Sequence, residues 1–221
     1  MKVGVLFSGG KDSTYAALLA KRMGYDVACL ITLVSKNKES YMFHTPAIEL
    51  TQKQAKAMDI PLIKRETTGV KEEELKDLEK AIYRAKMDYQ IEGVVTGAVE
   101  SVYQATRIQT ICNRLQLECF NPLWQKDQIE LLEDLIKNKF DMVVAGVFAY
   151  PFDQKWLGRK IDDRFIIKIK ELAEKYKINP AGEGGEFESF VLNCPLFKKP
   201  LKIQDIKISG SGNAWRADFI I

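Results

Sequence analysis

The sequence contains few of the side chains that most often bind metals or attack substrates. Its 221 residues include one histidine, His44, and four cysteines, Cys29, Cys112, Cys119 and Cys194. No two cysteines form a C-x-x-C pair, and their spacing matches no common zinc site. A single histidine with no serine or cysteine nucleophile motif near it argues against a catalytic triad. We therefore expect reduced cysteines in a cytosolic protein.

Long apolar runs and an excess of one charge are also absent. No apolar stretch approaches the roughly 20 residues that span a bilayer, and Lys2 leads straight into the first expected strand with no signal peptide before it. The formal net charge is only +3, which neither supports nor excludes a nucleic-acid footprint. We expect a cytoplasmic protein with no membrane contact and no nucleic-acid partner. The sequence leaves open whether the protein forms a homo-oligomer.

Strands and helices alternate through the first half of the chain. The expected strands are residues 3–7, 27–33, 62–64, 93–96 and 117–120. The expected helices begin near residue 12 and cover residues 46–58, 72–89 and 102–115, with Thr45 and Pro46 as the N-cap and first residue of the second helix. This order predicts an α/β, Rossmann-like fold with a five-stranded parallel sheet and helices on both faces. Ligands of such sheets bind beyond the carboxyl ends of the strands, so the loops after the first, second and fourth strands should form one site.

The pattern changes after Pro122. Helices are expected at 128–139 and 163–176, and strands at 142–148, 189–192, 202–209 and 214–221. We interpret residues 1–121 as a nucleotide-binding domain and residues 122–221 as a second, smaller α+β domain that binds the substrate.

A glycine-rich turn joins the first strand to the first helix. Its sequence is Ser8-Gly9-Gly10-Lys11-Asp12-Ser13. Unpaired backbone N–H groups and the positive end of the helix dipole converge at such a turn, which is the geometry that binds phosphate. The glycines let the backbone approach an anion, the serines and Lys11 add donors, and Asp12 can cap the helix and help to hold Mg²⁺. The spacing differs from a Walker A motif, because one residue separates the first glycine from the lysine.

A second helix begins where the fourth strand ends. Gly97 closes that strand, and the helix starts near Ser101. Tyr103, Gln104 and Arg107 lie on its first two turns, where they can meet a phosphate or an acidic substrate. The alternative is a capped surface helix.

Two other polar features have plainer interpretations beside the functional ones. His44 lies beyond the second strand, where a nucleotide should bind, and a structural role is equally open. An acidic run in the third helix is better explained as a solvated face. That run consists of Glu72, Glu73, Glu74, Asp77 and Glu79.

The second strong motif crowds three carboxylates around two glycines. Its sequence is Glu183-Gly184-Gly185-Glu186-Phe187-Glu188-Ser189. The carboxylates would repel one another unless a cation lay between them, so a plain turn is the weaker interpretation. Carboxylates beside an aromatic ring suit a quaternary ammonium ligand. They also suit a metal, although no histidine or cysteine joins them.

The first motif is similar to the SGGxDS loop of the N-type ATP pyrophosphatases, which split ATP into AMP and pyrophosphate. Together with the later EGGEFES motif, it resembles the diphthine–ammonia ligase family. That family carries out the last step of diphthamide synthesis on translation elongation factor two. The resemblance covers most of the chain, including residues 42–50, 92–107, 122–124 and 180–192.

The resemblance implies a reaction with ATP and Mg²⁺ in which the carboxylate of diphthine, a trimethylated histidine derivative, becomes an acyl-adenylate that ammonia attacks. It implies that residues 8–13 bind the ATP phosphates and that residues 183–189 lie in the diphthine-binding region. We expect Gly97 to belong to the ATP site and Ser101, Tyr103 and Gln104 to contact substrate. We expect catalytic roles for the following four residues: Lys11, Asp12, His44 and Arg107.

Two other functions stay open. One is a tRNA-modifying adenylating enzyme such as a thiolase, which would need Cys112 and Cys119 as a catalytic pair and a basic RNA-binding surface. The other is an ATP sensor without catalysis, against which the intact Lys11 and Asp12 argue.

Overall fold

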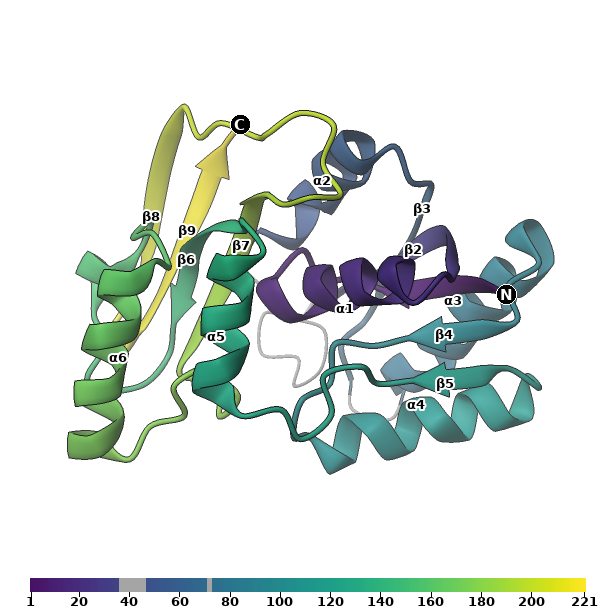
Figure 1. Ribbon diagram of the computed structural model, residues 1–221, viewed down its shortest axis with the longest axis horizontal. Helices are drawn as coiled ribbons and strands as arrows, with labels where there is room; N and C mark the ends of the chain where they lie inside the picture. The colour runs from purple at the N-terminus through teal and green to yellow at the C-terminus, as the bar shows by residue number, and fades with distance from the viewer. Residues whose placement is uncertain (36–46, 71–72) are drawn as a thin grey trace.

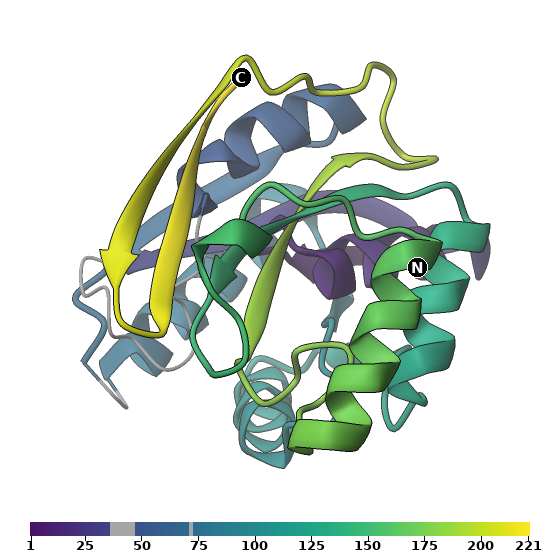
Figure 2. The same cartoon turned by 90° about the vertical axis from the view of Figure 1, so that its left-hand side faces the viewer.

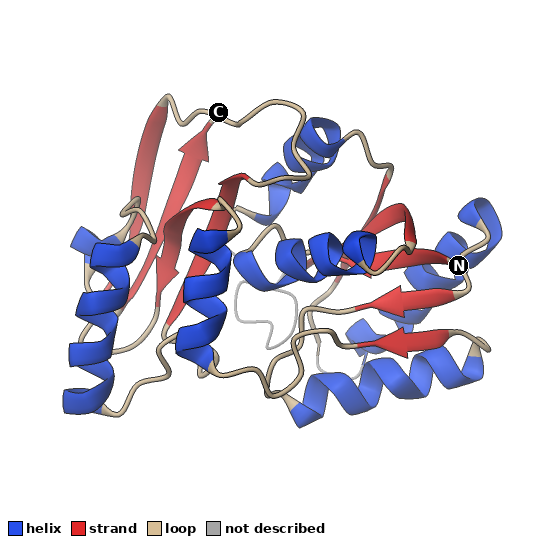
Figure 3. Ribbon diagram, in the orientation of Figure 1, coloured by secondary structure: helices blue, strands red, loops and turns tan. Residues whose placement is uncertain are grey.

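The computed structural model describes residues 1–35, 47–70 and 73–221, and within them the chain forms two separate sheets (Figures 1 and 3). His44 lies outside the described residues, as do Thr45, Pro46 and Glu72. The first sheet has five strands in the order β3-β2-β1-β4-β5, and every neighbouring pair is parallel. Its strands are β1 (Lys2–Leu6), β2 (Asp26–Ser35), β3 (Leu62–Thr67), β4 (Gly93–Val95) and β5 (Glu118–Phe120). The predicted Rossmann-like sheet is confirmed.

Helices cover both faces of this sheet because its strands carry apolar side chains on both faces. In β4, Val94 packs into the cluster under helices α3 (Glu73–Tyr89) and α4 (Val102–Arg114), as does Ile82 of α3. The next residue, Val95, packs into the opposite cluster under α1 (Lys11–Arg22) and α2 (Thr51–Met58). Since successive side chains of a strand point to opposite faces, a continuous apolar run is buried on both sides.

The second sheet has the order β7-β6-β9-β8, and each neighbouring pair of strands is antiparallel. Its strands are β6 (Asp141–Val147), β7 (Phe187–Asn193), β8 (Asp205–Ser211) and β9 (Ala214–Ile220). Helices α5 (Gln128–Lys137) and α6 (Asp163–Tyr176) run side by side next to it (Figure 2). One buried apolar cluster contains residues of α1, α5 and β6, so the two halves share a hydrophobic core.

Three local predictions were wrong. The second helix does not run from Pro46, because Ala47 has a left-handed backbone with φ of 63°; a 3-10 turn (Ile48–Leu50) precedes α2, which begins at Thr51. Asp12 does not cap α1, because the N-cap is Gly10 and the Asp12 carboxylate bonds to the Lys11 ammonium instead. The acidic run is not uniformly solvated, since Glu74 is buried on the inner side of α3.

Candidate active site

A cavity of about 460 Å³ lies at the carboxyl ends of β1, β2 and β4. This edge is where the strand order reverses, because β2 and β4 flank β1 on opposite sides. Both sequence motifs contribute to its wall. The lining residues of the two motifs are Ser8, Gly10, Lys11, Asp12, Ser13, Glu183, Gly184, Gly185, Phe187, Glu188 and Ser189. The loops after β1 and β4 therefore meet at one cavity, as predicted, and the second motif joins them there, whereas residues 36–46 of the loop after β2 lie outside the described residues.

The first motif places the start of α1 at the cavity wall. Gly9 has a φ of 81°, a conformation that glycine adopts without strain, and it turns the chain between β1 and α1. The N–H groups of Asp12 and Ser13 lie in the first turn of α1, so they have no carbonyl partner within the helix. The Ser8 N–H donates to Ser13 Oγ at 3.2 Å, which closes the turn. The backbone thus presents donors that have no partner within the helix, together with the positive end of its dipole, to the cavity.

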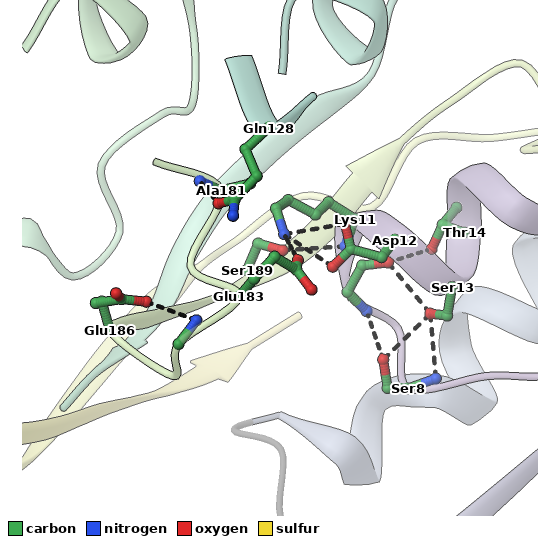
Figure 4. A network of polar contacts seen from close by, with 12 residues as sticks. Ser8, Lys11, Asp12, Ser13, Thr14, Gln128, Ala181, Glu183, Glu186 and Ser189 are labelled. Carbon is green, nitrogen blue, oxygen red and sulfur yellow. Dashed lines mark hydrogen bonds and ion pairs between the residues drawn. The ribbon is translucent and has the colours of Figure 1, made fainter. Parts of the chain in front are cut away.

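Lys11 is buried between two carboxylates (Figure 4). Its Nζ lies 2.8 Å from Asp12 Oδ2 and 3.5 Å from Glu183 Oε1. Burial of the ammonium lowers the Lys11 pKa, but the Asp12 and Glu183 charges outweigh this effect and the pKa is raised overall. Lys11 therefore stays charged and supplies a cation beside the crowded carboxylates of the second motif. Of the three carboxylates in that motif, Lys11 forms an ion pair with Glu183.

Strand β7 runs directly beside the first motif. The Lys11 N–H donates to Ser189 Oγ at 3.0 Å, and the Val191 N–H donates to the Gly9 carbonyl at 3.1 Å. Gln54 of α2 joins the same two segments, because its Nε2 donates to the carbonyls of Gly9 and Val191 at 2.9 and 2.8 Å. Gln54 is fully buried, and no sequence motif marks it. These contacts fix the first motif to the second half of the chain.

Gly97 touches the start of α1. A Cβ at this position would lie 2.6 Å from Ser13 N and 2.7 Å from the Asp12 carbonyl carbon, which is closer than real Cβ contacts. Only glycine lets the loop after β4 approach the helix terminus this closely. Gly97 also lines the cavity, as expected from the sequence.

Glu186 is turned away from the cavity and holds its own loop together. Its Oε1 accepts from the N–H and Nδ2 of Asn179 at 2.7 and 3.0 Å, and its Oε2 accepts from the Gly184 N–H at 2.9 Å. Gln128 braces the same loop by accepting from the Ala181 N–H and donating to Asn179 Oδ1. The sequence assigned Glu186 to substrate binding. The arrangement gives this prediction no support, because three N–H donors already engage its carboxylate and it is absent from the cavity wall.

The other two carboxylates of the motif line the cavity and have raised pKa values. Burial raises the pKa of Glu183 to about 7, with the Asp12 charge adding to the effect and Lys11 opposing it. Burial raises the pKa of Glu188 to about 8, against the opposing charges of Arg216 and Lys11. Perturbed carboxylates in a cleft are a common mark of functional sites.

Helix α4 contributes part of its first turns to the cavity. Ser101 caps the helix by accepting from the Gln104 N–H at 3.3 Å, and both residues line the cavity, with Ile108 beyond them. Tyr103 and Arg107 do not line it. The Arg107 guanidinium lies 3.5 Å from the centre of the Tyr103 ring, so these side chains stack on each other. The expected role of Arg107 at the site receives no support from this arrangement.

The cysteines lie apart from the site. Cys112 is near the far end of α4 and Cys119 is in β5, and none of the four cysteines lines the cavity. The Cys112 thiol hydrogen-bonds Cys119 and is buried, which together raise its pKa, so it is a poor nucleophile. Among the described residues no group of three His, Cys, Asp or Glu side chains could hold a metal ion. No helix in the described ranges is long and apolar enough to cross a membrane.

Two family models match the chain. The diphthamide synthase N-terminal domain matches residues 1–119, and the diphthamide synthase C-terminal domain matches residues 127–217. The diphthine–ammonia ligase of Homo sapiens is 33% identical over 227 residues, which cover 94% of this chain and 85% of the relative. That of Danio rerio is 34% identical over 221 residues, covering 92% and 86%. That of Saccharomyces cerevisiae is 29% identical over 251 residues, covering 98% of this chain and 36% of the longer relative.

Solved structures give a weaker likeness. A predicted subunit of a tRNA methyltransferase from Methanocaldococcus jannaschii has a TM-score of 0.46 and 16% identity, covering 91% of this chain and all of the other. The U34-tRNA thiolase NcsA from Methanococcus maripaludis has a TM-score of 0.40 and 17% identity, covering 84% of this chain and 70% of the other. Scores this low carry no argument about function.

Proposed function

Because this chain belongs to the diphthamide synthase family, we propose that it joins ammonia to the carboxylate of diphthine on translation elongation factor two. ATP is split into AMP and pyrophosphate in the reaction, and diphthamide is the product. The observation that carries the proposal is the junction of the two motifs: the Lys11 N–H donates to Ser189 Oγ, and Lys11 Nζ pairs with Glu183. A phosphate-binding turn and an acidic, partly aromatic wall thereby face one cavity.

ATP fits this cavity by size and by chemistry. The volume of about 460 Å³ lies within the usual range for ligand sites. We assign the phosphates to the first turn of α1, where the Asp12 and Ser13 N–H groups and Lys11 supply donors and positive charge. Gly97 keeps the opposite wall close enough for the loop after β4 to contact the nucleotide.

Asp12 is the residue that we assign to Mg²⁺. Its side chain is 27% exposed at the cavity wall, next to the phosphate-binding turn. Protein sites often hold Mg²⁺ through one or two carboxylates together with substrate phosphates, so a single carboxylate here agrees with the absence of a larger ligand cluster among the described residues. When bound, the ion would neutralise phosphate charge as pyrophosphate leaves.

We assign diphthine to the wall made by the second motif. Glu183 and the ring of Phe187 line the cavity beside Lys11, and a carboxylate with an aromatic face suits a quaternary ammonium group. The acceptor carboxylate then attacks the α-phosphorus of ATP, and ammonia attacks the resulting mixed anhydride with AMP as leaving group. The chain supplies position and charge rather than a covalent nucleophile. By this assignment residues 1–121 bind the nucleotide and residues 122–221 bind the acceptor, in the cytoplasm where the factor acts.

The test combines purified protein with Mg·ATP, ammonium and an elongation factor that carries diphthine. We expect AMP, and no ADP, in an amount that matches the acid-to-amide mass change on the factor. If AMP forms whether or not the factor is present, the enzyme cleaves ATP but diphthine is not the acceptor. RNA would then be tested as the acceptor. ATP binding without turnover under any acceptor would support a sensor instead.

A further inference from the structure

One carboxylate of the cavity has a buried oxygen that no described residue engages. Glu188 lines the cavity, and its Oε2 is buried without a hydrogen-bond partner among the described residues. A buried polar atom normally has a partner, and a buried carboxylate oxygen without one is energetically costly. The unpaired oxygen therefore points to a donor that arrives with a ligand.

The position of Glu188 in the sheet explains why its own chain does not satisfy it. Its neighbours Phe187 and Ser189 face the other side of β7, where they contact Lys11. Glu188 pairs with Gly146 of β6, which also pairs with Arg216 of β9. Because both residues lie opposite Gly146 in the register, Glu188 and Arg216 lie on the same face of the sheet, and Gly146 places no side chain between them.

The other acidic groups around the cavity are already engaged. Asp12 and Glu183 both pair with Lys11, the Glu186 carboxylate accepts three N–H bonds, and Glu100 accepts from Gln128 Nε2 at 3.2 Å. Within the described part of the chain, Glu188 is the cavity carboxylate with a buried oxygen that lacks a hydrogen-bond partner.

The proposed function requires a reactant that brings such a donor. Ammonia, like the side-chain amine of lysine, is mostly protonated at neutral pH, and the ammonium ion cannot attack a carbonyl carbon until it loses a proton. We propose that Glu188 binds the ammonium ion in the cavity and accepts its proton. This inference rests on the proposed function and names the base for its second step.

Proton transfer to Glu188 precedes formation of the C–N bond. An N–H bond of ammonium breaks and an O–H bond forms at Glu188 Oε2, which leaves ammonia with a lone pair. That pair forms the C–N bond to the acyl carbon, and the C–O bond to AMP breaks with its electron pair on the phosphate. The second surplus proton on nitrogen goes to the departing AMP phosphate or to water, and Glu188 returns its proton to solvent.

The protonation behaviour of Glu188 suits this role. Burial raises its pKa to about 8, while the charges of Arg216 in β9 and Lys11 in α1 oppose the shift. A general base works best when its pKa lies near the operating pH. A carboxyl group at its ordinary pKa would be a much weaker base toward ammonium.

The test compares two nucleophiles in the Glu188→Gln variant. Glutamine keeps the shape of the side chain but cannot take up the proton. We expect kcat/KM for ammonium to fall about 100-fold or more, in line with the loss of a general base. Hydroxylamine is largely unprotonated at neutral pH and needs no base, so hydroxamate formation should fall less than about tenfold. The exposed Glu174→Gln variant on α6 serves as the matched control and should behave as wild type.

Three results would separate the possible failures. Equal losses with ammonium and hydroxylamine, or no loss with either, would overturn the role of Glu188. A wild-type enzyme that forms neither amide nor hydroxamate would instead refute the proposed function. If Glu188→Gln does not fold, as judged by ATP binding in calorimetry, Glu188→Asp replaces it. Aspartate keeps a carboxylate base, but its side chain is shorter by one methylene, so the carboxylate lies further from the ammonium ion. The kcat/KM for ammonium should therefore still fall more than that for hydroxylamine.

Discussion

Replacing Gly97 with alanine tests whether the start of α1 is the ATP phosphate site. The added Cβ would meet Ser13 N at 2.6 Å and the Asp12 carbonyl carbon at 2.7 Å, whereas ordinary contact begins at 3.4 Å. Both obstacles are backbone atoms, so no side-chain rotation relieves them. The loop after β4 and the first turn of α1 must move apart by most of an ångström.

A displacement of this size at a reacting site costs about 100-fold in rate, because position supplies much of the catalysis. We expect kcat/KM for ATP to fall by about that factor in amide formation, and unfolding to become easier by about 1–3 kcal/mol from overpacking. Calorimetric titration with Mg·ATP should show weaker binding in parallel.

Gly212→Ala is the control. Gly212 lies between β8 and β9 with a φ of 56° and open space around a Cβ, so alanine there costs about 1–2 kcal/mol of backbone strain without touching the cavity. It should lose stability and keep its ATP affinity. Gly97→Ala with wild-type affinity and turnover would refute the assignment of the phosphates to this helix terminus.

Three further predictions follow from the charged groups. Lys11→Met should lower amide formation by about 10²–10³-fold, because it removes a preorganised cation and leaves Asp12 and Glu183 unneutralised; wild-type turnover would contradict this. Glu186→Gln should lower the free energy of unfolding by about 1–3 kcal/mol, measured in urea, with ATP affinity unchanged, because the amide cannot accept all three loop N–H bonds. Glu183 and Glu188 have pKa values of about 7 and 8 in the folded chain, above their ordinary 4.5, so the folded state binds more protons and stability should fall as pH rises from about 4.5 to 8. Urea unfolding across this range should show a shallower decline in Glu188→Gln, and an identical slope would argue against its raised pKa.

Much of the fold and both motifs could be predicted because their signals are local. The apolar runs of 3–7 and 27–33 are contiguous, and the glycines of the first motif stand between a strand and a helix whose patterns are themselves clear. The parallel order then follows from the alternation of strands and helices, and it places the strand-end loops at one edge.

Side-chain direction in the site could not be predicted, because contacts distant in sequence determine it. Glu183 and Glu186 flank the same pair of glycines, yet the Glu186 carboxylate turns into its own loop because Asn179 and Gly184 offer three N–H donors. Gln54 joins Gly9 to Val191, which lies 137 residues beyond Gln54 in the sequence. No periodicity marks either partner in advance, so both roles became visible only in the fold.

The charge around the cavity explains why the first motif relies on its backbone. Lys11 is a cation, but Asp12 and Glu183 already pair with it, and Glu188 adds a third acidic group to the wall. A polyanion such as ATP entering this space would meet more carboxylates than ammonium groups. The N–H groups at the start of α1 carry partial positive charge that can face the phosphates, and Mg²⁺ at Asp12 would offset the remaining negative charge. Glycine at positions 9, 10 and 97 is therefore central to the site, because it lets these backbone dipoles come close to the phosphates where side-chain charge alone is insufficient.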